Sequence, residues 1–260
     1  MNIYTWQESV WKQIASLGLG RPNALLLMGR RGIGKLDFAR AFSQYLLCED
    51  RLPSMSACGK CQGCLWYLNG NHPDFRLLQP DAYDEPADAH DSDDRAKDTE
   101  KKESNQIRIE QIRGLDEFIN LTSHRKGYKV IVIHPAESMN LHAANAVLKT
   151  LEEPPDNTLF ILVSHKPRRL LPTIVSRCRS IAMPVPGREA ALAWLAQQDI
   201  AEQDIALAQA GYAPLAAVEI AERENQGQRR EFLHQISMPR LDPLALAENA
   251  RRYLLSDVVS

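Results

Sequence analysis

The sequence predicts an α/β protein, in which a parallel sheet surrounded by helices is followed by a smaller, all-helical domain. Short apolar runs that suit buried strands alternate with segments whose apolar residues recur at helical spacing, which is typical of a parallel sheet built from strand–helix units. Beyond residue 186 only alanine- and leucine-rich helical segments follow. A length of 260 residues also makes two domains the natural expectation.

Composition and charge exclude several classes of protein. With 44% hydrophobic and 25% charged residues, the chain is ordinarily globular. Its net charge of −2 gives no support for strong nucleic-acid binding. No apolar run approaches the roughly 20 residues that span a bilayer, and no basic-then-apolar leader opens the chain. We therefore expect a soluble, cytoplasmic protein with no membrane partner.

The N-terminal part predicts a helix, a strand and a second helix. Residues 1–20 suit an amphipathic helix on the edge of the domain, with Trp6, Val10, Ile14 and Leu17 on one face. A short buried strand follows at 24–28. A second helix then carries apolar residues at helical spacing, namely Phe38, Ala41, Phe42 and Tyr45.

The turn between that strand and that helix has the spacing of a phosphate-binding loop. Gly29, Gly32 and Gly34 would let backbone amides curl around phosphates at the helix N-terminus, and Lys35 would reach the terminal phosphates. The fit to G-x-x-x-x-G-K-[ST] fails only at Leu36, which replaces the hydroxyl that would bind Mg²⁺. We expect a phosphate-cradling loop in which ATP binding is an open question.

Four cysteines follow that helix with the spacing of metal ligands. Cys48 precedes Cys58, Cys61 and Cys64, and the last three are separated by two-residue gaps. In a chain that resembles a cytosolic protein, this spacing indicates a metal rather than disulfides. Four thiolates around Zn²⁺ form a closed structural site at about residues 48–64, whereas an iron–sulfur cluster is the rival interpretation.

The middle of the chain alternates between buried and solvated segments. Strands are expected at 74–78 and 129–133, and a helix between them carries Ile112, Leu115 and Ile119. The stretch 79–104 holds ten acidic and four basic residues and few aromatic ones. Because it cannot bury enough apolar area to fold alone, we expect a disordered surface insertion there.

The most informative run extends from Asn140 to Ile181. Leu141, Ala144, Leu148 and Leu151 predict a helix with one buried face, and the pair Pro154-Pro155 would end it. An almost uninterrupted apolar strand is expected at 158–163, then a short helix at 170–175 and a last strand at 180–183.

This run resembles the AAA+ clamp-loader family of bacterial DNA polymerase III. The resemblance rests on the sequence Ala-Asn-Ala-Val-Leu-Lys-Thr-Leu-Glu-Glu-Pro-Pro at Ala144–Pro155 and on the motif Ser-Arg-Cys at Ser176–Cys178, and it extends to about residue 235. It implies a RecA-like AAA+ P-loop domain over residues 1–185. It also implies that the four-cysteine insertion holds structural zinc, and that Ser164 occupies the place of a polar nucleotide-sensing residue.

The resemblance also implies which parts of the ATPase apparatus are missing. In active members of this family an acidic pair follows the strand at 129–133, one carboxylate holding Mg²⁺ and the next polarising the attacking water. This sequence has His134 and Pro135 there, and Glu137 lies three residues beyond His134. An imidazole is a poor ligand for Mg²⁺, and proline can do neither task. We therefore expect no intrinsic hydrolysis.

By the same resemblance, Arg177 is an arginine finger that reaches the terminal phosphate in a neighbouring subunit's ATP site. Without the family match, a salt bridge within its own domain would be the preferred interpretation. The implied partners are gamma/tau-like and delta-like clamp-loader subunits, the sliding clamp through the assembly, and primed DNA within the complex.

The C-terminal part is expected to hold a helical lid over residues 186–237, after a stiff hinge at Pro184–Pro186. Residues 238–260 would be a linker and the first helix of a truncated collar domain. The function favoured is a non-hydrolysing stator subunit of the clamp loader. One rival is a working, gamma-like ATPase subunit of the same loader, and another is a zinc-dependent nucleic-acid-binding module.

Overall fold

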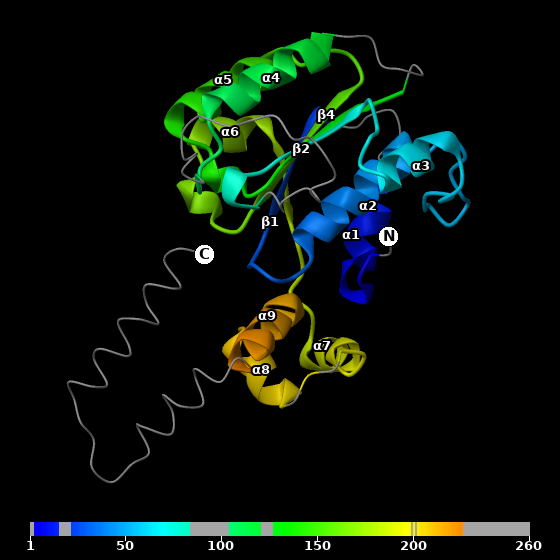
Figure 1. Cartoon of the computed structure of the whole chain (residues 1–260), viewed down its shortest axis with the longest axis vertical. Coiled ribbons are helices and arrows are strands. Elements are labelled where there is room, and N and C mark those ends of the chain that lie inside the picture. The colour runs from blue at the N-terminus through cyan, green and yellow to red at the C-terminus, as the bar shows by residue number, and fades with distance from the viewer. Residues whose placement is uncertain are drawn as a thin grey trace, which may run out of the picture. The chain divides into compact units, whose positions relative to one another are not determined.

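A computed structural model describes residues 3–15, 22–83, 104–120, 127–198, 200 and 202–225 (Figure 1). The chain divides into two compact units, Met1–Val185 and Pro186–Ser260, so the boundary falls at the proline-rich hinge. No helix in the part that the structure describes is long and apolar enough to cross a membrane.

The first unit is built on one sheet of five parallel strands in the order β2-β3-β4-β1-β5. This confirms the predicted parallel α/β sheet. Every residue of β3 and β4 is buried, as their apolar sequences require. The strands are β1 (Ala24–Met28), β2 (Phe75–Leu78), β3 (Lys129–Ile133), β4 (Thr158–Ser164) and β5 (Arg179–Ala182).

Helices cover both faces of this sheet, with α4, α5 and α6 on one side and α1, α2 and α3 on the other (Figure 1). Ile112 of α4, Val147 of α5 and Ile174 of α6 are buried in one apolar cluster with Ile131 and Phe160 of the sheet. Burial of each such side chain contributes about 1.5–3 kcal/mol. The bounds are α1 (Glu8–Ala15), α2 (Lys35–Leu47), α3 (Gln62–Leu68), α4 (Ile109–Asn120), α5 (Leu141–Glu152) and α6 (Pro172–Arg177).

The N-terminal helix differs from the prediction. Residues Thr5–Gln7 form a 3-10 turn, η1, and the α-helix begins only at Glu8. Val10 and Ile14 are buried as expected, whereas Trp6 lies in the turn and serves another purpose, described below. Residues 16–21, which include Leu17, lie outside the part that the structure describes.

The buried face of α5 also needs a correction. Ala144 and Leu151 are buried as predicted, but the side chain of Leu141 is 60% exposed. Leu141 is the first residue of the helix, whose N-cap is Asn140, so it precedes the stretch that packs on the sheet. Val147 takes a core position instead.

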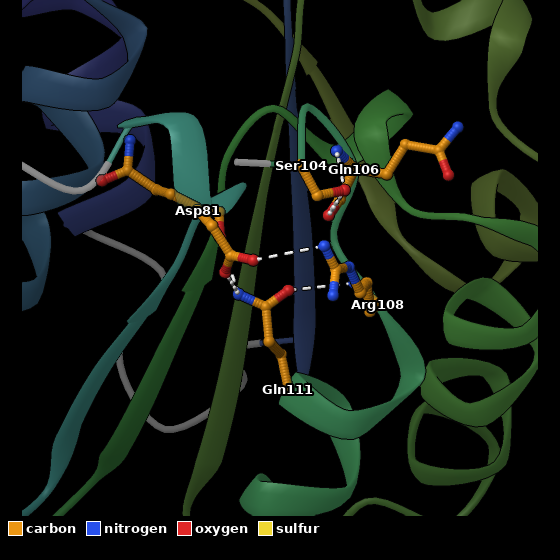
Figure 2. Close-up of polar contacts among 6 residues, drawn as sticks. Asp81, Ser104, Gln106, Arg108 and Gln111 are labelled. Atoms are coloured by element: carbon orange, nitrogen blue, oxygen red, sulfur yellow. Dashed lines mark hydrogen bonds and ion pairs between the residues drawn. The ribbon is translucent and has the colours of Figure 1, made fainter. Parts of the chain in front are cut away.

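The two ends of the acidic insertion are ordered, so the predicted disorder over 79–104 does not apply to residues 79–83 and 104. Asp81–Tyr83 form a 3-10 turn, η3. Figure 2 shows how the ends are joined: Gln111 Nε2 donates to Asp81 Oδ1 at 3.3 Å, and Arg108 lies 3.7 Å from Asp81 Oδ2. The Ala82 amide reaches the Ser104 carbonyl. Residues 84–103 lie outside the part that the structure describes.

In the part of the second unit that the structure describes, three helices surround a small core rich in alanine. Leu195, Leu207 and Ala217 are buried at its centre. The helices are α7 (Arg188–Leu195), α8 (Gln203–Gln209) and α9 (Pro214–Asn225). The remaining residues of the predicted lid, 226–237, and the predicted collar segment, 238–260, lie outside the described part.

Candidate functional site

The glycine-rich loop follows β1 at the carboxyl edge of the sheet and leads directly into α2. Gly32 and Gly34 have φ values of 77° and 80°, a left-handed conformation that glycine adopts without strain. Helix α2 begins at Lys35. The strand, turn and helix predicted from the sequence are therefore present with the loop in its expected place.

The N-terminal segment, predicted to be a plain edge helix, holds this loop. Gln7, which is fully buried, donates through Nε2 to the carbonyls of Ile33 and Gly34 at 2.9 and 2.8 Å. Trp6 Nε1 donates to the same Ile33 carbonyl. The ring of Tyr4 packs so closely that a Cβ on Gly34 would lie 2.3 Å from it. The N-terminal arm thus fixes the end of the loop from outside.

Lys35 is directed into its own loop. Its side chain is buried, and Nζ donates to the carbonyls of Gly29 and Arg30. Burial lowers the pKa of Lys35 to about 8, an effect that the nearby Glu137 carboxylate partly opposes. The ammonium group therefore remains charged at neutral pH, but its hydrogen bonds are made within the loop.

A histidine and a proline, His134 and Pro135, occupy the position of the expected acidic pair, and a second histidine lies against the first. His134, which follows β3, places Nε2 3.2 Å from Nε2 of His165, which follows β4. Its Nδ1 lies 3.2 Å from Nε2 of Gln79. Burial, together with the charges of Lys35 and neighbouring arginines, lowers the pKa of His134 to about 3 and that of His165 to about 4. Both rings are neutral at pH 7, and neither supplies the hard oxygen ligand that Mg²⁺ prefers.

Glu137 lies nearby and is held by the loop that follows β4. Its Oε1 accepts hydrogen bonds from the backbone amides of His165 and Lys166 at 2.9 and 3.0 Å. Because these bonds turn the carboxylate towards the loop after β4, Glu137 acts as a brace between β3 and β4. Sequence register alone gave no sign of this contact.

Ser164, at the end of β4, is placed beside the start of the loop. Its backbone carbonyl accepts from the Gly29 amide at 3.3 Å. Its hydroxyl, Oε2 of Glu137 and Nδ1 of His165 are buried and have no protein partner among the described residues. The edge thus keeps polar atoms at the place where a nucleotide would bind. The hydroxyl and the acidic pair that the ATPase motif uses are replaced here by Leu36, His134 and Pro135.

The four predicted metal ligands are brought together. The Sγ atoms of Cys48, Cys58, Cys61 and Cys64 all lie within 4.8 Å of one another, and those of Cys48 and Cys61 are 3.9 Å apart. Thiolates bound at about 2.3 Å to one tetrahedral ion would be separated by about 3.8 Å. The spacing therefore fits a single metal ion, whereas a cluster of several irons needs a wider cage.

Backbone amides support the same arrangement. The amides of Cys58, Cys61 and Cys64 donate to the sulfurs of Cys48, Cys58 and Cys61 at 3.3, 3.2 and 3.4 Å. Such donors stabilise negative charge on sulfur. Cys178 is not part of this group: it packs in the core beneath α6, where burial raises the pKa of its thiol to about 11.

Arg177 is the last residue of α6, and its side chain is 35% exposed. The guanidinium Nη2 donates to Oε1 of Glu152 at 2.5 Å, and Nη1 donates to the Thr173 carbonyl at 3.1 Å. The salt bridge within its own domain is therefore present. The arginine side chain nevertheless stays partly exposed to solvent.

Comparison with known proteins decides the family. The family model described as DNA polymerase III, delta subunit, matches residues 8–186. The chain is 37% identical to the delta-prime subunit of Pseudomonas aeruginosa over 95% of this chain and 71% of that protein. It belongs to the DNA polymerase III delta-prime family. It is 34% identical to the delta-prime subunit of Escherichia coli, over 90% of this chain and 65% of that protein.

Two further similarities complete the comparison. The Haemophilus influenzae delta-prime subunit is 32% identical over 94% of this chain and 70% of that protein. A solved gamma subunit-related protein of Thermotoga maritima aligns with a TM-score of 0.47 and 20% identity, over 91% of this chain and 68% of that one. The chain spans 65–71% of the length of the three delta-prime relatives.

The buried histidine pair of this delta-prime family member predicts a pH dependence of stability. In the unfolded chain each imidazole binds a proton near pH 6.5, whereas the folded pKa values are about 3 and 4. The unfolded state therefore binds more protons between these values, and the free energy of unfolding falls as pH falls below 6.5. Between pH 7 and pH 5, we expect the free energy of unfolding to fall by about 1–2 kcal/mol more in the parent chain than in His165→Asn.

Urea unfolding at both pH values measures this difference. His142→Asn is the matched control, because it removes a histidine that is exposed on α5 rather than one of the buried pair. If the free energy of unfolding fell equally in the parent and in His165→Asn, the assignment of His134 and His165 as a neutral buried pair would be contradicted.

Proposed function

We propose that this chain is the non-hydrolysing, delta-prime-type subunit of a DNA polymerase III clamp loader. It would act as the stator of the assembly that loads a sliding clamp onto primed DNA, and it would donate Arg177 to a neighbouring ATPase subunit. The observation that carries the proposal is a glycine-rich loop in the position of a P-loop, whose hydrolytic positions hold Leu36, His134 and Pro135.

The absence of intrinsic hydrolysis follows from what each position lacks. Leu36 cannot bind Mg²⁺, and the His134–His165 pair is neutral and directed inwards. The ring of Pro135 has no polar atom and cannot polarise an attacking water. ATP remains a candidate ligand of Gly29, Gly32, Gly34 and Lys35, with binding and no turnover as the expectation.

The role of Arg177 is supported by its place and chemistry. A guanidinium carries five N–H donors in a fixed plane, and the contacts with Glu152 and Thr173 use two of them. The remaining donors and the positive charge suit a phosphate that gains negative charge in the transition state. Arginine fingers accelerate phosphoryl transfer by roughly 10³–10⁵-fold.

The metal is proposed to be zinc with a structural role. Four thiolates leave no open position for substrate, so the site would order residues 48–64 rather than catalyse a reaction. We further propose the division into an AAA+ domain at 1–185, a lid at 186–237 and the start of a collar at 238–260. The partners are gamma/tau-like and delta-like subunits in the cytoplasm.

The two rival functions have less support. A working, gamma-like ATPase would need the acidic pair and the hydroxyl that the chain lacks. A zinc-dependent nucleic-acid module would need basic side chains around the cysteines. Residues 48–64 offer only Arg51 and Lys60, which Glu49 and Asp50 oppose. The Arg51 guanidinium is bound to the carbonyls of Tyr45 and Leu46.

The zinc proposal predicts a stoichiometry and a loss of stability. The purified chain should contain one Zn²⁺, and Cys61→Ser should reduce the zinc content and lower the melting temperature, because structural zinc stabilises small modules by roughly 10–16 kcal/mol. Metal analysis and calorimetry test this, with Cys178→Ser as the control that keeps its zinc. A parent chain with iron, or without metal after purification in zinc-containing buffer, would contradict it.

The trans-acting role predicts opposite outcomes for two variants in the reconstituted loader. Arg177→Ala should slow hydrolysis at the neighbour's site by roughly 10³-fold or more, because a transition-state charge loses its partner. Lys35→Ala should change the loader's rate of ATP hydrolysis by less than about twofold, because this chain's own site is proposed not to hydrolyse ATP.

Clamp- and DNA-stimulated ATP hydrolysis, followed in a single turnover, measures both variants. The reverse pattern, with loss at Lys35 and none at Arg177, would mean that this chain's own site turns over and that the stator assignment is wrong.

A further inference from the structure

Helices α5 and α6 bring together two charged side chains that lie 25 residues apart in sequence. Glu152, the last residue of α5, accepts from Arg177 Nη2 at 2.5 Å. Thr173, one turn earlier on α6, accepts from Arg177 Nη1 through its carbonyl at 3.1 Å. Two oxygens from two different helices therefore fix the plane of one guanidinium.

We infer that Glu152 is a positioning residue for Arg177, holding the finger in the orientation in which it meets a neighbour's ATP. This inference rests on the proposed function, because a finger must act in trans for its orientation to matter. Glu152 would not touch the nucleotide. It would act only through the guanidinium that it holds.

Both members of the pair are attached to rigid parts of the core. Glu152 directly follows Leu151, which is buried, and Arg177 lies three residues after Ile174, which is fully buried in the same apolar cluster. The distance between the two backbone positions is thus set by core packing. The flexible part is the arginine side chain itself, and this is the part that the carboxylate and the carbonyl restrain.

A purely structural role for the pair is a weak explanation. The two side chains are 35% and 50% exposed, and exposed ion pairs add little to the stability of a fold. Orientation of a reacting group is different, because small misplacements cost large factors in rate. The contacts also leave three of the five guanidinium N–H donors for a phosphate.

The alternative is that Glu152 keeps Arg177 away from the neighbour's phosphate. The two roles predict opposite changes in the rate of hydrolysis when the carboxylate is removed. If the carboxylate competed with phosphate for the guanidinium, its removal would speed hydrolysis. If it positions the finger, its removal slows hydrolysis without changing how tightly the neighbour binds ATP. The direction of the change in kcat therefore decides between the two roles.

The test uses the reconstituted loader with the full chain and measures ATP hydrolysis in the presence of clamp and primed DNA. Glu152→Ala should lower kcat at the neighbour's site by about 10–100-fold, with the KM for ATP unchanged within about twofold. Glu152→Gln keeps an oxygen in the same place and should recover part of the loss. Glu153→Ala, the adjacent exposed carboxylate, is the matched control and should behave as the parent.

A double variant adds a readout that a structural role would not change. Glu152→Ala combined with Arg177→Ala should be no slower than Arg177→Ala alone, because Glu152 acts through Arg177. A parental or faster rate for Glu152→Ala, beside a slow Arg177→Ala, overturns the positioning role and leaves the proposed function standing. A parental rate for Arg177→Ala itself overturns the proposed function, and the inference with it.

Discussion

Burial of the central strands on both faces is the constraint on which the rest of the structure depends. Strands β1, β3 and β4 are almost wholly buried, and because all strands run parallel, their carboxyl ends meet at one edge. That edge brings together the glycine-rich loop, His134 and Ser164 from three distant segments. The helices that bury the sheet also determine where Glu152 and Arg177 meet.

At this edge the chain keeps the geometry of a nucleotide site while replacing its chemistry. Lys35 is charged but bonded to its own loop, and the neutral imidazole of His134, which lies against His165, stands in the place of a carboxylate. Hydrolysis requires Mg²⁺ ligands and a polarised water, neither of which these groups provide. Under the proposed function, the same fold would retain its packing and its exposed Arg177 without carrying out a reaction of its own.

Features that depend on residues close in sequence could be predicted, namely the strands, the glycine-rich turn and the cluster of four cysteines. Contacts between distant segments could not. The hydrogen bonds of Gln7 to the loop, the brace formed by Glu137 and the meeting of Glu152 with Arg177 all depend on how elements pack. The exposure of Leu141 was missed for a related reason, since helical periodicity alone does not say where a helix first touches the sheet.

The proposed function requires that this chain act on a neighbour's ATP and not on its own. The decisive measurement is a structure of the assembled loader with a non-hydrolysable ATP analogue, at a resolution that shows side chains. We expect the Arg177 guanidinium to lie within hydrogen-bonding distance of a terminal phosphate on the adjacent subunit, with no Mg²⁺ beside His134. An Arg177 remote from every phosphate, together with a Mg²⁺–nucleotide complex in this chain's own loop, would contradict it.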